Sequence, residues 1–263
     1  MERVSTARPW LWPNLLSIDA PIVAVLWQLL FARCFHADVN VMAAVLLVLA
    51  VWLIYAADRL LDARCSRWRK PLRLPRHEFY RRHWPVVTPV WIAVLAVAAW
   101  LACTRISAEI FDRGTALAAG VGFYFVVVHH LRWHWPKELA VGILFALGAS
   151  LAAWGKVRSA ADAATIALFS CLCWINCVAI EKWERRSVTP WPVGAAALLV
   201  AVAATIFLSA HRPVLSGAEA LSALAFVALD RGRDHFSGDA LRVLADVALL
   251  SPLLFLPLAR TAL

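Results

Sequence analysis

The chain has 263 residues, of which 62% are hydrophobic and 16% are charged, and its mean hydropathy is +0.71. Soluble domains contain about 45–50% apolar residues, so this composition excludes an ordinary soluble protein and indicates a protein that lies in lipid. A net charge of +9 would indicate binding of nucleic acid if the basic residues lay on a soluble surface. Here the distribution of the basic residues follows the membrane topology. We therefore expect membrane lipids as partners and no nucleic acid.

Apolar stretches of about 17 to 25 residues recur along the chain, and each can cross a hydrocarbon core of about 30 Å as a helix. The first stretch is too long for a signal-peptide core and lacks a small-residue cleavage pattern, so we treat it as a span. In chain order, the predicted spans are 13–33, 40–57, 84–104, 114–131, 138–154, 162–183, 190–210, 214–230 and 239–260. The sequence thus predicts an all-α polytopic membrane protein, with residues 1–263 forming one domain of about nine transmembrane helices and a basic cytoplasmic loop at about 58–83.

The basic residues divide unequally between the two sides of the membrane. With nine spans and a cytoplasmic N-terminus, the cytoplasmic segments hold 19 of the 26 Lys and Arg residues, and the opposite side holds seven. Because Lys and Arg are enriched in cytoplasmic loops, we expect this orientation, in a membrane of the bacterial cytoplasmic type.

The first group of acids with potential function lies where the second predicted span meets the basic loop. Asp58 and Asp62 are four residues apart, so both carboxylates lie on one helical face and repel each other unless a cation or basic group sits between them. The alternative is a solvated helix end in which the two acids pair with Arg59 and Arg64. Charged groups near membrane depth are costly and therefore functional candidates.

A second acidic group lies at the cytoplasmic end of the sixth predicted span. Glu181 and Glu184 are three residues apart and emerge on the same side as Asp58 and Asp62. Two acidic helix ends on one side can converge on one cation, and Mg²⁺ is usually held by one or two carboxylates together with substrate phosphates. Asn176 lies deeper and slightly off that face, so it is a weaker candidate.

Three segments carry a resemblance to a known family. The segment Ile54–Asp62 is similar to the motif Asn-Asp-x-x-Asp-x-x-x-Asp, with matches at Asp58, Arg59 and Asp62. The basic stretch Arg69–Arg76 is similar to an Arg-Pro-Leu-Pro stretch, and Trp135–Gly148 to a Pro-Gln-x-x-Leu-Gly-x-x-Phe segment. With the second acidic group, the chain resembles the UbiA superfamily of intramembrane prenyltransferases over most of its length.

The resemblance implies a Mg²⁺-dependent transfer of an isoprenoid chain from a prenyl diphosphate to a lipid-soluble acceptor, inside a cavity open to lipid. In that reading Asp58 and Asp62 are catalytic, and they hold the metal together with Glu181 and Glu184. The expected diphosphate-binding residues are Arg59, Arg73, His130, Arg132 and Lys137, and the expected substrate-cavity residues are Asn14, Asp19, Tyr55 and Asn176.

The chain departs from the family pattern at several of these positions. Ile54 and Tyr55 stand where the family has Asn and Asp, and the second motif has Glu in place of Asp. A Tyr adds no charge to a Mg²⁺ site. The histidines near His130 supply phosphate-binding charge in one reading and are ordinary interfacial residues in the other.

Two alternatives to the transferase follow from these departures. One is a non-catalytic UbiA-like paralogue that binds an isoprenoid lipid or a membrane partner, and the other is a secondary transporter that uses the same acids as ion ligands. A transporter usually shows internal repeats, and this chain shows no convincing one. For Asp19, before Pro21, capping a helix broken at Pro21, hydrogen bonding within the bundle and lining the cavity are all open.

Overall fold

The computed structural model describes residues 9–65, 75–129, 137–185 and 192–260, apart from the side chains of 62–65, 75–78, 129, 184–185 and 260. The described residues form helices and contain no strand, as expected for a chain that must satisfy its backbone hydrogen bonds within lipid. The α-helices are α1 (Trp12–Leu15), α2 (Asp19–Cys34), α3 (Val41–Cys65), α4 (Pro75–Arg105), α5 (Ala108–His129), α6 (Lys137–Ser150), α7 (Ala160–Arg185), α8 (Val193–Ala203), α9 (Pro213–Gly232), α10 (Gly238–Ala248) and α11 (Pro252–Phe255). Shorter 3-10 and π segments precede or follow several of them: η1 (Pro9–Leu11), η3 (Leu151–Lys156), η4 (Ala204–Leu208), η5 (Arg233–His235) and η6 (Leu258–Arg260).

Six helical segments of the described chain are long and apolar enough to cross a membrane: Val41–Leu61, Phe79–Arg105, Ala108–Val128, Lys137–Lys156, Ala160–Trp183 and Pro213–His235. A seventh span results if the bent pair Pro9–Leu15 and Asp19–Cys34 counts as one. The protein is therefore a polytopic all-α membrane protein. Helices also occupy the other two predicted spans, but Val193–Leu208 is shorter, and 239–260 is divided among α10, α11 and η6.

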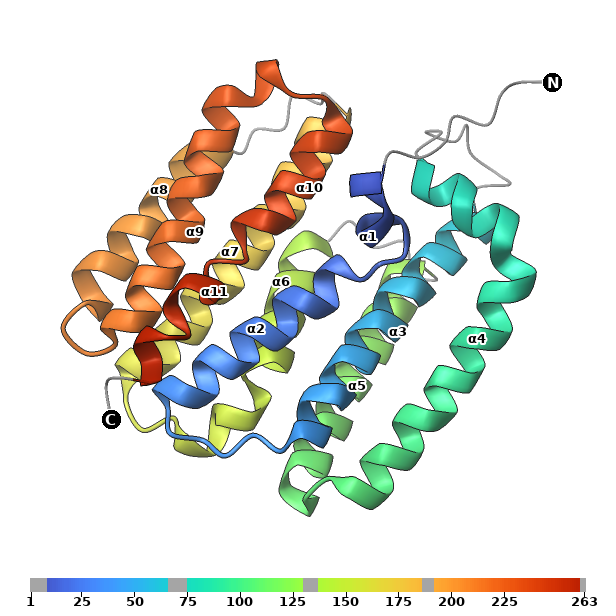
Figure 1. Cartoon of the computed structure of the whole chain (residues 1–263), viewed down its shortest axis with the longest axis horizontal. Helices are drawn as coiled ribbons and strands as arrows, with labels where there is room; N and C mark the ends of the chain where they lie inside the picture. The colour runs from blue at the N-terminus through green and yellow to red at the C-terminus, as the bar shows by residue number, and fades with distance from the viewer. Residues whose placement is uncertain (1–8, 66–74, 130–136, 186–191, 261–263) are drawn as a thin grey trace.

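The helices are arranged in two groups that meet at α2 and α6 (Figure 1). On one side α7 packs against α6, α8, α9 and α10, and on the other α3 packs against α2 and α4. Consecutive long helices run in opposite directions (Figure 1). We call the end of the bundle where α3 ends the Asp58 end, and the end where α7 begins the Asp162 end.

Large aromatic side chains fill the core between α2 and α7. Trp27, Phe31 and Phe169 are fully buried, and the rings of Trp27 and Phe169 stack with centroids 4.1 Å apart. The Trp27 indole N–H donates to the backbone oxygen of Leu249 at 2.9 Å. A buried indole N–H needs such a partner. The buried and stacked rings show that this group of helices is tightly packed.

The first predicted span is broken. The break falls at residues 16–18, where Ser17 has φ 56°, and the helices on its two sides are bent by 74°. A break at Pro21 was one of the possibilities considered for Asp19, but Pro21 lies within the first turn of α2, where an N–H has no helical partner and proline is tolerated. Asp19 begins α2, and its Oδ1 accepts a hydrogen bond from the backbone N–H of Ala20 at 3.0 Å.

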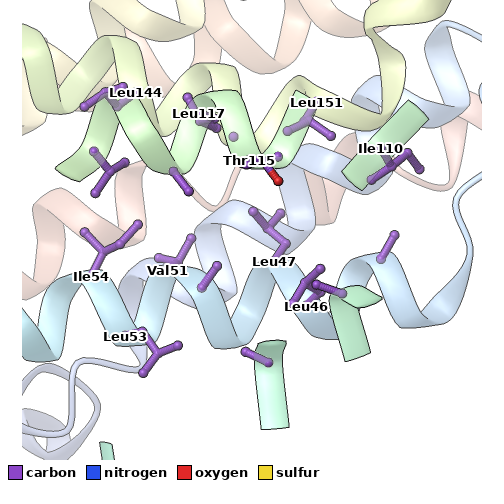
Figure 2. A pocket seen from close by; sticks show the side chains of 18 of the residues that line it. Leu46, Leu47, Val51, Leu53, Ile54, Ile110, Thr115, Leu117, Leu144 and Leu151 are labelled. Atoms are coloured by element: carbon purple, nitrogen blue, oxygen red, sulfur yellow. The ribbon is translucent and has the colours of Figure 1, made fainter. Parts of the chain in front are cut away.

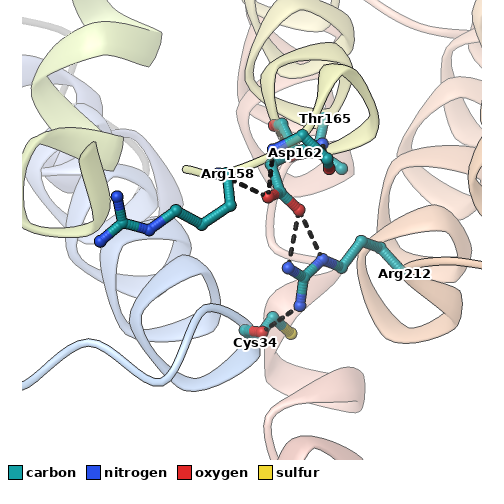
Figure 3. Close-up of polar contacts among 6 residues, drawn as sticks. Cys34, Arg158, Asp162, Thr165 and Arg212 are labelled. Atoms are coloured by element: carbon teal, nitrogen blue, oxygen red, sulfur yellow. Dashed lines mark hydrogen bonds and ion pairs between the residues drawn. The ribbon is translucent and has the colours of Figure 1, made fainter. Parts of the chain in front are cut away.

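At the Asp162 end, one arginine joins three helices (Figure 3). Arg212, just before α9, donates from Nε and Nη2 to Oδ1 of Asp162 at 2.8 and 2.7 Å. Its Nη1 donates to the backbone oxygen of Cys34 at 2.7 Å. The other carboxylate oxygen of Asp162 accepts from the backbone N–H groups of Arg158 and Ser159 at 2.9 and 3.0 Å. The end of α2 and the starts of α7 and α9 are thus connected through one ion pair.

Candidate functional site

An apolar cavity of about 370 Å³ lies between α3, α4, α5 and α6 (Figure 2). Its wall consists almost entirely of aliphatic side chains, among them Leu47 and Val51 of α3, Leu117 of α5 and Leu144 of α6. The cavity is partly open, and α5 makes its main contacts with α6 and η3 rather than with α3. This space suits a flexible hydrocarbon chain that enters from the bilayer.

The cavity reaches the predicted Asp-rich motif at the Asp58 end. Ile54 and Tyr55 both line the cavity, and Asp58 and Arg59 follow one helical turn later on the same helix. Asp58 is half-buried, whereas Arg59 is only 5% exposed. The apolar wall therefore ends where the charged motif begins.

Arg59 is held in place by polar groups of two other segments. Its Nε donates to the Ser17 hydroxyl at 2.8 Å, and the hydroxyls of Ser17 and Tyr80 lie 3.1 Å apart. Tyr80, on α4, is 2% exposed. The break at 16–18 thus places a hydroxyl where the end of α3 meets the start of α4, and it fixes the direction of the Arg59 side chain.

A cluster of five polar side chains, Asn14, Asp19, Asn176, Arg242 and Asp246, lies beside this end of the cavity. Asn14 donates to Oδ2 of Asp19 at 2.6 Å and accepts from Nε of Arg242 at 3.0 Å. Asn176 donates to Oδ1 of Asp246 at 3.2 Å, and the Asp246 carboxyl lies within electrostatic range of the Asp19 carboxyl and the Arg242 guanidinium. The structure therefore brings three of the four predicted substrate-cavity residues into one polar cluster.

Tyr55 links the polar cluster to the cavity. Its side chain lines the cavity, and it lies within electrostatic range of Asp19 and Asp246. Asn14, Asp19 and Asn176 are absent from the cavity wall, so their role toward a substrate stays a prediction.

Glu181 has a neighbour that we did not expect. Its carboxyl lies within electrostatic range of that of Glu138, at the start of α6. The ammonium group of Lys137 lies 3.9 Å from the Glu138 carboxylate, and the Lys137 side chain is 52% exposed. Two neighbouring carboxyls can share a proton or a cation, since two full negative charges repel each other.

The predicted convergence of the two acidic groups stays untested. The side chains of Asp62 and Glu184 lie outside the described residues, as do Arg73, His130 and Arg132. Among the described residues, no group of three or more His, Cys, Asp or Glu could hold a metal ion. Carboxylate oxygens are nonetheless the ligands that Mg²⁺ takes, and substrate phosphates commonly complete its shell. Asp58 and Glu181, the two predicted ligands whose side chains the structure describes, carry oxygens of this kind.

Several polar residues of this region were missed in the sequence. Asp246 and Arg242 lie four residues apart in the last predicted span, and Glu138 begins the fifth. An acid within an apolar run is a functional candidate by default, so Asp246 could have been found by that criterion. The same holds for Glu219 of α9, which is fully buried.

No known protein family, curated protein or solved structure was found to match the chain. The resemblance to the UbiA superfamily therefore depends on the motifs in the sequence, and membership stays a prediction.

Proposed function

We propose that the protein is a UbiA-like intramembrane prenyltransferase, which transfers an isoprenoid chain from a prenyl diphosphate to a lipid-soluble acceptor. The observation that carries the proposal is the position of the apolar cavity, whose wall ends at Tyr55, one helical turn before Asp58 and Arg59. A prenyl diphosphate has the matching form, since an apolar chain is joined at one end to a charged group.

In this proposal the cavity holds the isoprenoid chain and keeps water away from the allylic carbon when its bond to the diphosphate breaks. Arg59, positioned by Ser17 at 2.8 Å, neutralises charge on the departing diphosphate. Asp58 and Asp62, with Glu181 and Glu184, would hold Mg²⁺, and the ion would supply further positive charge to the leaving group. Lys137 would contribute a mobile positive charge, because its side chain is half exposed.

A second candidate, the non-catalytic paralogue that binds an isoprenoid lipid, is favoured by one observation. Ile54 and Tyr55 occupy positions of family metal ligands, and both line the cavity instead. The two candidates share the lipid site and differ in whether a metal ion and bond cleavage are involved.

The proposal includes the nine-span topology. In it, Val193–Leu208 and the region of α10 and α11 cross the membrane in addition to the six or seven segments that are long enough. The N-terminus is then cytoplasmic, in a membrane of the bacterial cytoplasmic type.

Binding of geranyl diphosphate to the purified protein, with and without Mg²⁺, tests the proposal. We expect Mg²⁺-dependent binding that weakens about tenfold or more in Asp58→Asn, because a ligand of the metal loses its charge. The matched control is Asp112→Asn, an exposed acid near the start of α5, which should bind as the wild type does.

Release of inorganic diphosphate, measured with extracted membrane lipids as the acceptor pool, separates the two candidates. Release that requires Mg²⁺ and Asp58 supports the transferase. Binding without release supports the paralogue, and no binding of any prenyl diphosphate would count against both.

A further inference from the structure

Gln28 stands out among the residues that line the cavity. Its side chain comes from α2 and contributes to the cavity wall, yet the residue is only 4% exposed. Its Oε1 is buried and has no hydrogen-bond partner among the described residues. Native proteins leave very few buried polar groups in this condition, because an unpaired amide loses its hydration without compensation.

Several other polar side chains in the bundle have partners, although Oδ1 of Asn176 and both carboxylate oxygens of Glu219 also lack one among the described residues. The hydroxyl of Ser150 donates to the backbone oxygen of Ala146 at 2.8 Å, and that of Ser216 to Ala204 at 2.8 Å. Ser222 and Ser251 are joined through their hydroxyls at 2.8 Å. Thr115, which also lines the cavity, donates to the backbone oxygen of Phe111 at 2.8 Å. Gln28 is thus one of three described residues with an unpartnered buried side-chain oxygen, and of these three it alone lines the cavity.

The depth of Gln28 in the cavity follows from the packing of α2 on α3. Ala24, one helical turn before Gln28, packs with Val51, and Leu47 and Tyr55 contact the same cluster. Since α2 and α3 run in opposite directions, Gln28 lies near the level of Leu47. Leu47 and Tyr55 are eight positions apart on α3, which corresponds to about 12 Å along a helix at about 1.5 Å per residue.

We propose that Gln28 binds an oxygen atom carried by the lipid in the cavity, about 12 Å from the Tyr55 end. The ligand class is an isoprenoid chain with a hydroxyl at its far end. A hydroxyl both donates and accepts, so it satisfies either orientation of the amide. That the ligand carries a diphosphate at the Tyr55 end rests on the proposed function. The preference of Gln28 for a chain with an oxygen at its far end does not.

The size of the cavity agrees with such a chain. At about 30 Å³ for each water-sized group, a volume of about 370 Å³ holds about a dozen non-hydrogen atoms. A geranyl chain with one terminal oxygen is of this size.

The test compares geranyl diphosphate with the same molecule hydroxylated at its far end, by calorimetric titration in detergent. We expect the wild type to bind the hydroxylated chain about three- to tenfold more tightly, the value of one net hydrogen bond. Gln28→Leu should lose this preference and bind the plain chain at least as tightly as the wild type. The control Thr115→Val, which removes a hydroxyl already bonded to its own helix, should keep the preference.

Equal affinities for the two diphosphates in the wild type would overturn the role of Gln28 and leave the proposed function intact. If neither diphosphate binds, the proposed function fails, and the comparison moves to geraniol and its parent hydrocarbon, which carry no diphosphate. A preference for the alcohol that disappears in Gln28→Leu would then still support the oxygen site, and no preference would overturn it.

Discussion

Removal of the Arg212 side chain should destabilise the protein more than removal of an equally exposed arginine elsewhere. Arg212 and Arg113 each have 26% of their side chain exposed, and each forms an ion pair with one carboxylate. The carboxylates differ, because Asp162 is 3% exposed whereas Glu109 is 67% exposed. The two arginines therefore form a matched pair of variants.

The magnitude follows from what each variant leaves behind. Arg212→Ala removes two bonds to Asp162 and one to the backbone oxygen of Cys34, and it leaves a buried carboxylate. Loss of one partner of a buried pair costs about 3–5 kcal/mol, but Asp162 keeps two backbone N–H donors, which lowers the expected cost to about 2–3 kcal/mol. Arg113→Ala breaks an exposed pair and should cost about 0–1 kcal/mol.

Reversible unfolding in mixed detergent micelles measures both free energies of unfolding. The double variant Arg212→Ala with Asp162→Ala completes a cycle, and we expect a coupling energy of about 1.5–3 kcal/mol between the two sites. A cost for Arg212→Ala within about 0.5 kcal/mol of that for Arg113→Ala, or no coupling in the cycle, would refute the view that burial of Asp162 makes this pair stabilising.

Two further predictions concern burial and topology. Glu219 is fully buried, and neither carboxylate oxygen has a partner among the described residues. Glu219→Leu should therefore stabilise the protein by about 1–3 kcal/mol in the same unfolding assay. A loss of stability would show that the carboxyl has a partner. Because the positive-inside bias places the end of α3 in the cytoplasm, an impermeant maleimide should leave Cys65 unlabelled in intact cells and label Ser107→Cys. Labelling of Cys65 under these conditions would reverse the orientation.

The positions of the helices could be predicted from the sequence because each apolar run is long enough to form one. The predicted spans 84–104 and 162–183 lie within α4 and α7, for example. The ends were less accurate, since α3 continues to Cys65, beyond the predicted end at 57. A helix extends past the hydrocarbon as long as its polar residues favour helix, and hydropathy does not report that extension.

The neighbours of the candidate residues could not be predicted, because they depend on contacts distant in sequence. Asn14 and Arg242 are separated by 228 positions and share a hydrogen bond. Glu138 of α6, a neighbour of Glu181, was not among the predicted site residues. Periodicity gives the face of a helix on which a residue lies, whereas the helix opposite that face is decided by packing.

Small side chains create the cavity that the proposed function uses. Ala50, Ala98 and Ala118 line it, together with Gly114, beside which a Cβ would meet nothing within 4 Å. Small residues at these positions hold space open between α3, α4 and α5, whereas aromatic rings fill the core between α2 and α7.

A cavity of this size must be filled in the membrane. At about 24 cal/mol per Å³, 370 Å³ kept empty would cost about 9 kcal/mol, which is comparable with the total stability of about 5–15 kcal/mol of a typical domain. Because the cavity is partly open, lipid tails can occupy it, and any apolar substrate chain must displace one. Exchange of one hydrocarbon for another gains little free energy in lipid. Selectivity must therefore come from polar contacts, such as those at the Asp58 end and at Gln28. Variants at these positions consequently discriminate between the proposals better than variants of the aliphatic wall.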